Sequence, residues 1–359
     1  MKVSALIITY DHERYIADAI DGALRQETNF DYEIVISEDC STDETRAIVR
    51  EYAADHPRIR ARYSPRNLGA AQNFVHGYRA CRGEYIAVLE GDDYWTSPKK
   101  LQKQADFLDR HVECSLCAHG VTRVAANGRS TRRIRHELKD VSKLDDLLLD
   151  NFIYTCSAML RKEAFHDYPS WVFDAPSSDY ALWVQAAGRG DIGYIKECLA
   201  AYRVHGAGAW SGKDLASQLE AVIEVREHLR WDLSPRYDRL MERVLARLYS
   251  QLACARAGVP NGAVVLVASG GDEQLMKLDR PTRHFPPKPK RASDVRSLEI
   301  DDLIKSLERE RGEGAEFLLF PRTELDWINW HDLRSYLDSH HRLLSSSTDA
   351  VLYDLRDRR

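Results

Sequence analysis

The stretch Tyr85-Ile86-Ala87-Val88-Leu89-Glu90-Gly91-Asp92-Asp93 decides the fold class of this 359-residue chain. Its first half is a short apolar run of the length that a buried strand needs. Carboxylates follow directly after that run. In open α/β sheets, ligands bind outside the carboxyl ends of the strands. The stretch therefore predicts a buried strand whose end carries a polar site.

Strand and helix patterns alternate through the first hundred residues. The apolar runs that predict strands are 3–9, 32–37, 59–63 and 85–89. The segments with helical periodicity between them are 14–26, 44–54 and 70–81. Strands that alternate with helices of this length imply right-handed crossovers and a parallel sheet. The sequence therefore predicts an α/β fold with a mostly parallel sheet flanked by helices.

Beyond the first hundred residues, the sequence predicts further helices and strands and a division into several parts. Residues 138–151 have a helical pattern, and residues 154–161 have the pattern of a strand. Further on, 214–257 predicts two helices with a break near Ser234-Pro235. The expected divisions are a first domain over 1–212, a helical region over 213–280, a Pro- and Lys-rich linker over 281–293 and a small α/β module over 294–359.

Composition narrows the class of protein. A hydrophobic fraction of 44% with a charged fraction of 30% excludes global disorder. The net charge is −5 and no basic stripe is visible, so nucleic acid is not expected as a partner. No apolar run has the length of a transmembrane segment. Seven cysteines without a secretion signal indicate reduced thiols, and we expect a cytoplasmic protein.

The acidic cluster Glu90-Gly91-Asp92-Asp93 carries three carboxylates within four residues. Carboxylates this close repel one another, and a hard divalent cation with oxygen ligands offsets that repulsion. The alternative is a solvated acidic turn. The position after a buried strand, together with the tight turn that Gly91 permits, favours the metal.

A second polar segment, Ser37 to Asp43, also follows a predicted strand. Asp39 has the chemistry to accept hydrogen bonds from a base or a ribose. Ser41 or Thr42 is suited to cap the helix that follows. The two interpretations are compatible, and both place this segment at the edge where ligands bind.

Taken together, the order and spacing of five segments resemble the family 2 glycosyltransferases of the GT-A fold. The segments are 7–10, 34–43, 67–69, 83–95 and 98–101. The resemblance covers about residues 1–205. It implies that a sugar moves from a nucleotide diphosphate, UDP most often, to an acceptor hydroxyl with inversion. It also implies Mn²⁺ or Mg²⁺ as a cofactor.

The resemblance assigns residues to the nucleotide. They are Thr9, Tyr10, Asp11, Asp39, Asn67, Gly69, Asp92 and Arg203. Within this set Asp39 would hold the base and Asp92 would lie near the ribose. Arg203 would face the pyrophosphate, whose geometry suits a guanidinium.

The resemblance also assigns the metal ligands and the catalytic general base. Asp93 would bind the metal, with Glu90 and His205 as further candidate ligands. Asp179, in a segment like the family's Glu-Asp-x-x-Leu-Trp, would be the general base, with Ser178 in place of the usual Glu. The alternatives are a helix N-cap for Asp179 and a structural role for His205.

Two other functions compete with this interpretation. One is a non-catalytic nucleotide- or carbohydrate-binding protein on the same fold. The other is a nucleotidyltransferase, which would normally carry a Gly-rich basic phosphate loop near the N-terminus, and Val3 to Arg14 has none. The acceptor is open among a glycan, a lipid-linked sugar, a natural product and a protein side chain. A homodimer is a further hypothesis.

Overall fold

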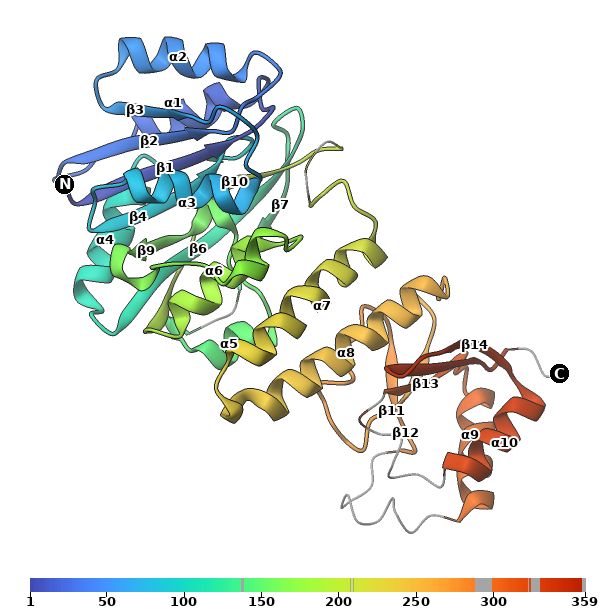
Figure 1. Ribbon diagram of the computed structural model, residues 1–359. Coiled ribbons are helices and arrows are strands. Elements are labelled where there is room, and N and C mark those ends of the chain that lie inside the picture. The colour runs from blue at the N-terminus through green and yellow to red at the C-terminus, as the bar shows by residue number, and fades with distance from the viewer. Residues whose placement is uncertain are drawn as a thin grey trace. The chain divides into compact units, whose positions relative to one another are not determined.

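The computed structural model describes residues 1–136, 139–206, 208, 210–287, 299–321, 323 and 330–356. Contacts divide the chain into two units, Met1–Gly212 and Lys213–Arg359. Each unit has its own sheet and helices (Figure 1). Among the described residues, no helix combines the length and the apolar character that a membrane crossing requires.

The first half of the first unit is a parallel sheet. Its strands are β1 (Val3–Thr9), β2 (Tyr32–Glu38), β3 (Ile59–Tyr63) and β4 (Tyr85–Glu90). They lie side by side in the order β3-β2-β1-β4, and every neighbouring pair is parallel. The predicted α/β class and the parallel arrangement of these strands are confirmed.

The second half extends the same sheet with mixed directions. Its main strands are β9 (Met159–Arg161), β6 (Cys114–Ala125), β10 (Asp191–Val204) and β5 (Tyr94–Trp95). β9 is antiparallel to both β4 and β6, whereas β10 is parallel to β6. Two short strands, β7 (Ser130–Ile134) and β8 (Val141–Ser142), pair with β6 and β10.

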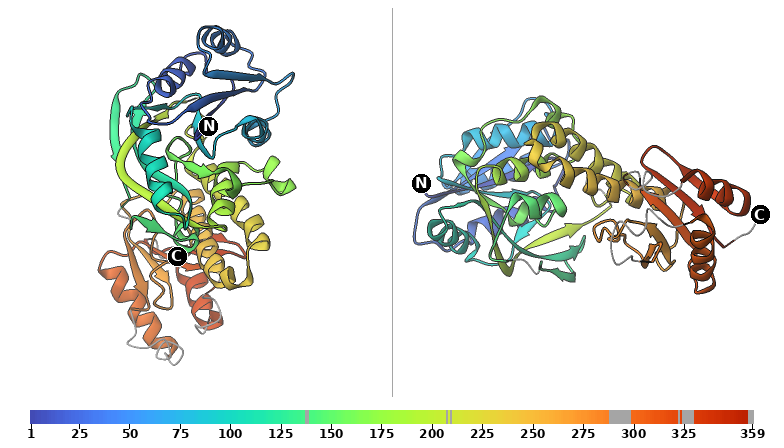
Figure 2. Two further views of the ribbon diagram at one scale, coloured as in Figure 1. Left: turned by 90° about the vertical axis from the view of Figure 1, so that its left-hand side faces the viewer. Right: turned by 90° about the horizontal axis from the view of Figure 1, so that it is seen from below.

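Helices cover both faces of this sheet (Figure 2). They are α1 (Ile16–Leu24), α2 (Thr45–Asp55), α3 (Ala70–Ala80), α4 (Lys100–Arg110), α5 (Leu144–Leu149) and α6 (Ser178–Ala187). Side chains alternate between the faces of β1. Ala5 and Ile7 join the core that includes α1, α2 and α4. Leu6 faces α3, where a Cβ on Gly77 would lie 2.5 Å from its Cδ1.

The middle of this unit differs from the sequence-based expectation. The helix predicted over 138–151 is limited to α5, because Lys143 N donates to the Asp146 carboxylate and starts the helix there. Residue 138 lies outside the described residues. The strand predicted over 154–161 begins only at Met159, after a 3-10 turn over Thr155–Ser157.

The second unit begins with the two predicted helices, α7 (Leu215–Asp232) and α8 (Asp238–Arg256). A five-stranded sheet follows, in the order β12-β11-β13-β15-β14. Its strands are β11 (Val265–Ala268), β12 (Thr282–Phe285), β13 (Phe317–Pro321), β14 (Arg342–Ser346) and β15 (Ala350–Asp354). Helices α9 (Ile300–Gly312) and α10 (Trp330–His340) complete the unit.

Two of these strands correct the expected divisions. β11 lies in the range assigned to a helical region, yet its apolar residues are buried between β12 and β13. A run this short satisfies its backbone groups in a sheet more readily than in a helix. β12 lies in the range assigned to a linker, and residues 288–293 of that range lie outside the described residues.

Candidate donor-binding site

The carboxyl ends of β1, β2 and β4 meet at one edge of the sheet. Thr9 is paired with Glu38 on β2, and Ile8 is paired with Glu90 on β4. The loops that follow these strands therefore start next to one another. This register brings the polar segments after residues 9, 38 and 90 into one site.

Asp39 braces the loop after β3. Its two carboxylate oxygens accept hydrogen bonds from Leu68 N at 2.8 Å and Gly69 N at 2.9 Å. Asn67 Oδ1 accepts from the same Gly69 amide. Gly69 has a φ of 82°, which a side chain would strain. The structure thus brings Asp39, Asn67 and Gly69 together, as the resemblance implies. Burial raises the pKa of Asp39, and the hydrogen bonds from the amides of Leu68 and Gly69 partly oppose that rise.

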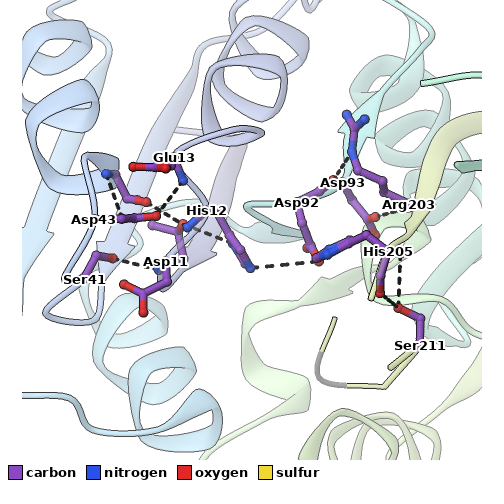
Figure 3. Close-up of polar contacts among 12 residues, drawn as sticks. Asp11, His12, Glu13, Ser41, Asp43, Asp92, Asp93, Arg203, His205 and Ser211 are labelled. Atoms are coloured by element: carbon purple, nitrogen blue, oxygen red, sulfur yellow. Dashed lines mark hydrogen bonds and ion pairs between the residues drawn. The ribbon is translucent and has the colours of Figure 1, made fainter. Parts of the chain in front are cut away.

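Asp11 links the loops after β1 and β2. Its amide donates to Ser41 Oγ at 3.0 Å (Figure 3). Its Oδ1 accepts from Thr42 N at 2.7 Å. Asp11 itself has a φ of 52°. Beside it, Tyr10 is 39% exposed while Thr9 is buried. Of the three candidates at this strand end, Tyr10 therefore offers an open ring surface.

Asp92 faces two histidines. His205 Nε2 lies 3.0 Å from Asp92 Oδ2, and His12 Nε2 lies 3.9 Å from the same oxygen. Figure 3 shows both imidazoles directed at this carboxylate, one from the loop after β1 and one from the end of β10. Together with the hydrogen bond to His205, the charge of His12 lowers the pKa of Asp92 against the effect of burial.

Asp93 points in another direction. Its side chain is nearly inaccessible, at 1% exposure, and its Oδ1 accepts from Arg203 N at 2.7 Å. Its Oδ2 is buried without a hydrogen-bond partner among the described residues. Burial and the neighbouring Asp92 raise the pKa of Asp93 well above its usual range. Of the two adjacent acids, Asp92 is thus the one open to a ligand.

Arg203 requires a correction, because its guanidinium is not directed at an open pyrophosphate position. Its side chain is 3% exposed, and Nη2 forms an ion pair with Asp18 at 2.8 Å. Nε donates to the Asp92 carbonyl and Nη1 to the Ala126 carbonyl. The guanidinium also lies over the ring of Tyr15 at 4.6 Å. The guanidinium nitrogens therefore form their hydrogen bonds within the protein. The bond from Nε to the Asp92 carbonyl fixes the backbone of the acidic cluster.

Asp179 lies in the first turn of α6, and Ser177 occupies the N-cap position instead. Ser177 Oγ donates to Asp179 Oδ1 at 2.8 Å, and Thr155 Oγ1 lies 3.5 Å from Oδ2. Asp179 stands close enough to Glu90 to affect its ionisation. Burial, followed by the charges of Asp92, Asp93 and Asp179, raises the pKa of Glu90. These four acids form one electrostatic group, although Asp179 comes from a distant segment.

His12 is a site residue that the sequence-based prediction missed. It lies two positions after Tyr10 in a loop that was already assigned to the nucleotide. A histidine in a loop after a strand is a weak signal by itself, because most such residues are solvated. Only the fold shows that its ring reaches the acidic cluster, which is 80 residues away from it in the chain (92 − 12).

Comparisons with known proteins show the family to which the chain belongs. The family model described as Glycosyl transferase family 2 matches residues 4–168. An uncharacterized protein of Mycobacterium tuberculosis is 37% identical over 240 residues, which is 62% of this chain and 68% of that protein. TuaG of Bacillus subtilis, a putative teichuronic acid biosynthesis glycosyltransferase, is 30% identical over 207 residues, or 56% of this chain and 79% of TuaG.

Solved structures share the fold. S. aureus TarS 1-349 in complex with UDP-GlcNAc matches with a TM-score of 0.55 at 14% identity, covering 99% of this chain and 98% of that one. The mannosyltransferase PcManGT from Pyrobaculum calidifontis, in complex with GDP-Man and Mn²⁺, matches with a TM-score of 0.51 at 15% identity, covering 72% and 76%. The fold is that of the glycosyltransferases of the GT-A class. The chain belongs to glycosyltransferase family 2 and is a glycosyltransferase.

Proposed function

We propose that this glycosyltransferase is an inverting, divalent-metal-dependent enzyme that uses a nucleoside diphosphate sugar, with UDP as the first candidate nucleotide. The observation that carries the proposal is the pairing of Asp92 with His205, beside the carboxylates of Glu90, Asp93 and Asp179. Without a cation the pKa values of Glu90 and Asp93 are raised, because burial and the neighbouring carboxylates oppose their charged forms. A diphosphate beside these acids would add to the repulsion, so we infer that a cation lies between them.

Two residues at this edge have the chemistry to bind a divalent cation, whereas no group of three or more His, Cys, Asp or Glu among the described residues is placed to hold one. Asp92 and His205 present a carboxylate oxygen and an imidazole nitrogen on the same side, and both are ordinary ligands of Mn²⁺. Glu90 and Asp93 lie beside them, and a bound cation would lower the raised pKa values of these two carboxyls and favour their charged forms. We therefore assign the metal to Asp92 and His205, with Asp93 and Glu90 as supporting charges. When bound, the cation would stabilise the developing charge on the leaving diphosphate.

The nucleotide would occupy the edge between the loops after β1 and β3. Tyr10 offers an exposed ring for the base, and the amides fixed by Asp39 shape the opposite side. Thr9 and Asp11 contribute by holding these loops in place. UDP is favoured because S. aureus TarS binds UDP-GlcNAc on this fold. The GDP-Man of the Pyrobaculum enzyme makes GDP the second choice.

Asp179 would act as the general base. The acceptor hydroxyl attacks the anomeric carbon while the bond from that carbon to the diphosphate oxygen breaks, and its electron pair leaves on the diphosphate. The proton of the hydroxyl passes to the Asp179 carboxylate. Ser177 fixes one oxygen of that carboxylate and leaves the other weakly held. One base and one displacement imply inversion at the anomeric carbon.

A glycan is the acceptor class we favour. TuaG is a putative teichuronic acid biosynthesis enzyme, and a polysaccharide precursor presents hydroxyls suited to this base. A lipid-linked sugar, a natural product or a protein side chain remains an alternative acceptor. The cytoplasmic location and the homodimer stay hypotheses.

The variant Asp179→Asn tests the assignment of the base. Removal of a general base costs about 10²–10⁴-fold in rate, and we expect a loss of that size in sugar transfer. Binding of the donor nucleotide should be retained, because Asp179 contacts the acceptor side. Asp174→Asn, an exposed acid close by in the chain, is the matched control. Transfer at the wild-type rate by Asp179→Asn would contradict this assignment.

A further inference from the structure

We propose that a basic cavity beside helix α3 binds the phosphate groups of an acceptor saccharide. The cavity has a volume of about 880 Å³. The basic side chains in its lining are Arg60, Arg62, His76, Arg79, Arg82 and Lys162. The nature of the ligand rests on the proposed transfer to a glycan, whereas the anion site itself depends on neither the metal nor the donor.

The first argument is the unbalanced charge of the lining. No Asp or Glu belongs to the described lining of this cavity. The guanidinium groups of Arg62 and Arg82 form no hydrogen bond or ion pair among the described residues. Lys162 Nζ donates to a backbone carbonyl, that of Cys81, at 2.6 Å, and not to a carboxylate. Three positive charges therefore stay available to an anion.

The other two arginines have acidic partners outside the lining. Arg60 pairs with the buried Glu33 at 2.7 Å, and Arg79 pairs with the exposed Asp167 at 3.0 Å. An ion pair between two exposed side chains is weak, so Arg79 can exchange Asp167 for a bound phosphate at little cost. Arginine suits this exchange because its planar fork matches phosphate oxygens.

The second argument is that the fold gathers these cations from separate segments. Arg60 and Arg62 lie on β3, His76 and Arg79 lie on α3, and Lys162 directly follows β9. The sequence therefore shows no basic stripe, although the chain builds a basic cavity. Because the net charge of the chain is −5, this local excess of positive charge does not follow from its composition.

The third argument is the length and position of the cavity. Its lining runs from Leu68, just before α3, to Arg82, just after it. The 11 residues of this helix span about 16 Å, which is longer than one phosphate group. The amide of Leu68 is also held by Asp39 in the donor-binding site. An extended ligand with several anionic groups would thus start near the donor and follow the helix.

The fourth argument concerns the sugar. Phe173 belongs to the lining and is 38% exposed. It ends the 3-10 turn over Ser170–Phe173 and lies six positions before the proposed base, Asp179 (179 − 173). An exposed aromatic ring offers an apolar surface to the C–H face of a sugar. A ligand that carries both sugar rings and phosphates therefore matches this lining better than inorganic phosphate.

The positive potential of the cavity acts on His76. Burial, followed by the charge of Arg62, lowers the pKa of His76, and the charge of Asp39 opposes that change. A bound polyanion would favour the protonated imidazole and raise this pKa. His76 is therefore a reporter of binding inside the cavity.

Calorimetric titration of the full-length protein with tripolyphosphate, in EDTA and without nucleotide, tests the anion site. We expect binding that weakens as salt is added, because mobile ions screen exposed charges. Arg62→Gln and Arg82→Gln should each weaken binding by about two- to fivefold, and Arg62→Glu combined with Arg82→Glu should abolish it. The control Arg110→Gln removes an exposed arginine from α4, on the other face of the sheet, and should change nothing.

NMR titration of His76, assigned with His76→Gln, locates the bound anion. Its pKa should rise when tripolyphosphate is added to the wild type, and not in the double variant. Absence of binding by the wild type, or equal binding by the double variant, would overturn the anion site. Because EDTA is present, neither result bears on the metal-dependent donor site, and a donor site that fails to bind nucleotide would leave this binding intact.

Comparison of glucose 1-phosphate with inorganic phosphate tests the saccharide. Glucose 1-phosphate should bind more tightly, and Phe173→Ala should remove the difference. Equal binding of the two by the wild type would overturn the assignment to a sugar phosphate. Sedimentation with phosphatidylglycerol vesicles completes the test. Vesicle binding that is lost in the double variant would assign the cavity to lipid headgroups instead.

Discussion

Asp92 and Asp93 are adjacent in the chain, yet their carboxylates have different surroundings. Asp92 faces His205 in the open part of the site, whereas Asp93 is buried against the backbone of Arg203. The motif predicted that acids gather here, but it placed the metal on Asp93. Which of the two neighbouring acids is the more exposed depends on β10, a strand whose pairing no local pattern reveals.

Arg203 is a second residue whose surroundings could not be predicted from the sequence. The sequence indicated a guanidinium near the site, and the resemblance directed it at pyrophosphate. In the structure its donors hold Asp18 and the carbonyls of Asp92 and Ala126. The partners of a long side chain come from segments up to 185 positions away, so sequence patterns alone do not identify them.

The variant Arg203→Met tests this structural role. It removes an ion pair with a partly exposed Asp18 and several charge-assisted hydrogen bonds, so we expect the free energy of unfolding to fall by about 2–4 kcal/mol. Urea unfolding followed by circular dichroism measures the change. Unchanged stability combined with a selective loss of nucleotide affinity would instead support the original pyrophosphate assignment.

The strands of the first half were predictable as elements because each is a short apolar run between turn residues. β1 and β3 have the predicted bounds, and β2 and β4 each extend one residue beyond them. β6 and β10 are longer and were not predicted, because polar residues interrupt their apolar pattern. In β10 the interruption by Lys196 and Glu197 coincides with a break in register against β6.

Helix α4 carries a feature that its amphipathic pattern does not predict. Its first residue, Lys100, is completely buried, and its Nζ lies 4.0 Å from the centre of the Trp95 ring. Among the described residues this amine has no hydrogen-bond partner. Burial lowers the pKa of Lys100 to about 7, because the charged form loses its hydration.

The variant Lys100→Met should therefore be more stable than the wild type, with a difference that depends on pH. In the unfolded chain the lysine pKa is about 10.4. Below pH 7 both states carry the proton and the cost of burying the charge is complete. Between pH 7 and 10 the folded state binds fewer protons than the unfolded state, so wild-type stability rises with pH.

We expect Lys100→Met to raise the free energy of unfolding by on the order of a few kcal/mol at pH 6, and by much less at pH 9. Urea unfolding at the two pH values measures both differences. A loss of stability of equal size at pH 6 and pH 9 would mean that the contact with Trp95 outweighs the cost of burial.

Over the whole chain, the sequence predicted the helices and strands of the first unit better than those of the second. Contacts divide the chain after Gly212, which is also where the sequence-based division ended its first domain. Beyond that point the two long helices have clear periodicity, and both were predicted. β11 and β12 were missed because runs of four residues carry little periodic signal, and their partners in the sheet come later in the chain.

All the residues assigned to the donor lie within Met1–Gly212, in segments from residue 9 to residue 205. The sheet places these segments at one edge, and hydrogen bonds between their loops join them there. A bound nucleotide and its cation should therefore stabilise the folded form of Met1–Gly212, since a ligand that binds only the native state raises its stability.

The most direct test is thermal unfolding of the full-length protein with UDP, GDP, dTDP, CDP or ADP, each with Mn²⁺ and with EDTA. One diphosphate should raise the unfolding temperature in Mn²⁺ only, by an amount equivalent to about 2.7 kcal/mol at a hundredfold excess over Kd. Asp92→Asn should abolish the shift. No shift with any nucleotide, or a shift that neither EDTA nor Asp92→Asn changes, would contradict a metal-dependent donor site at Asp92 and His205.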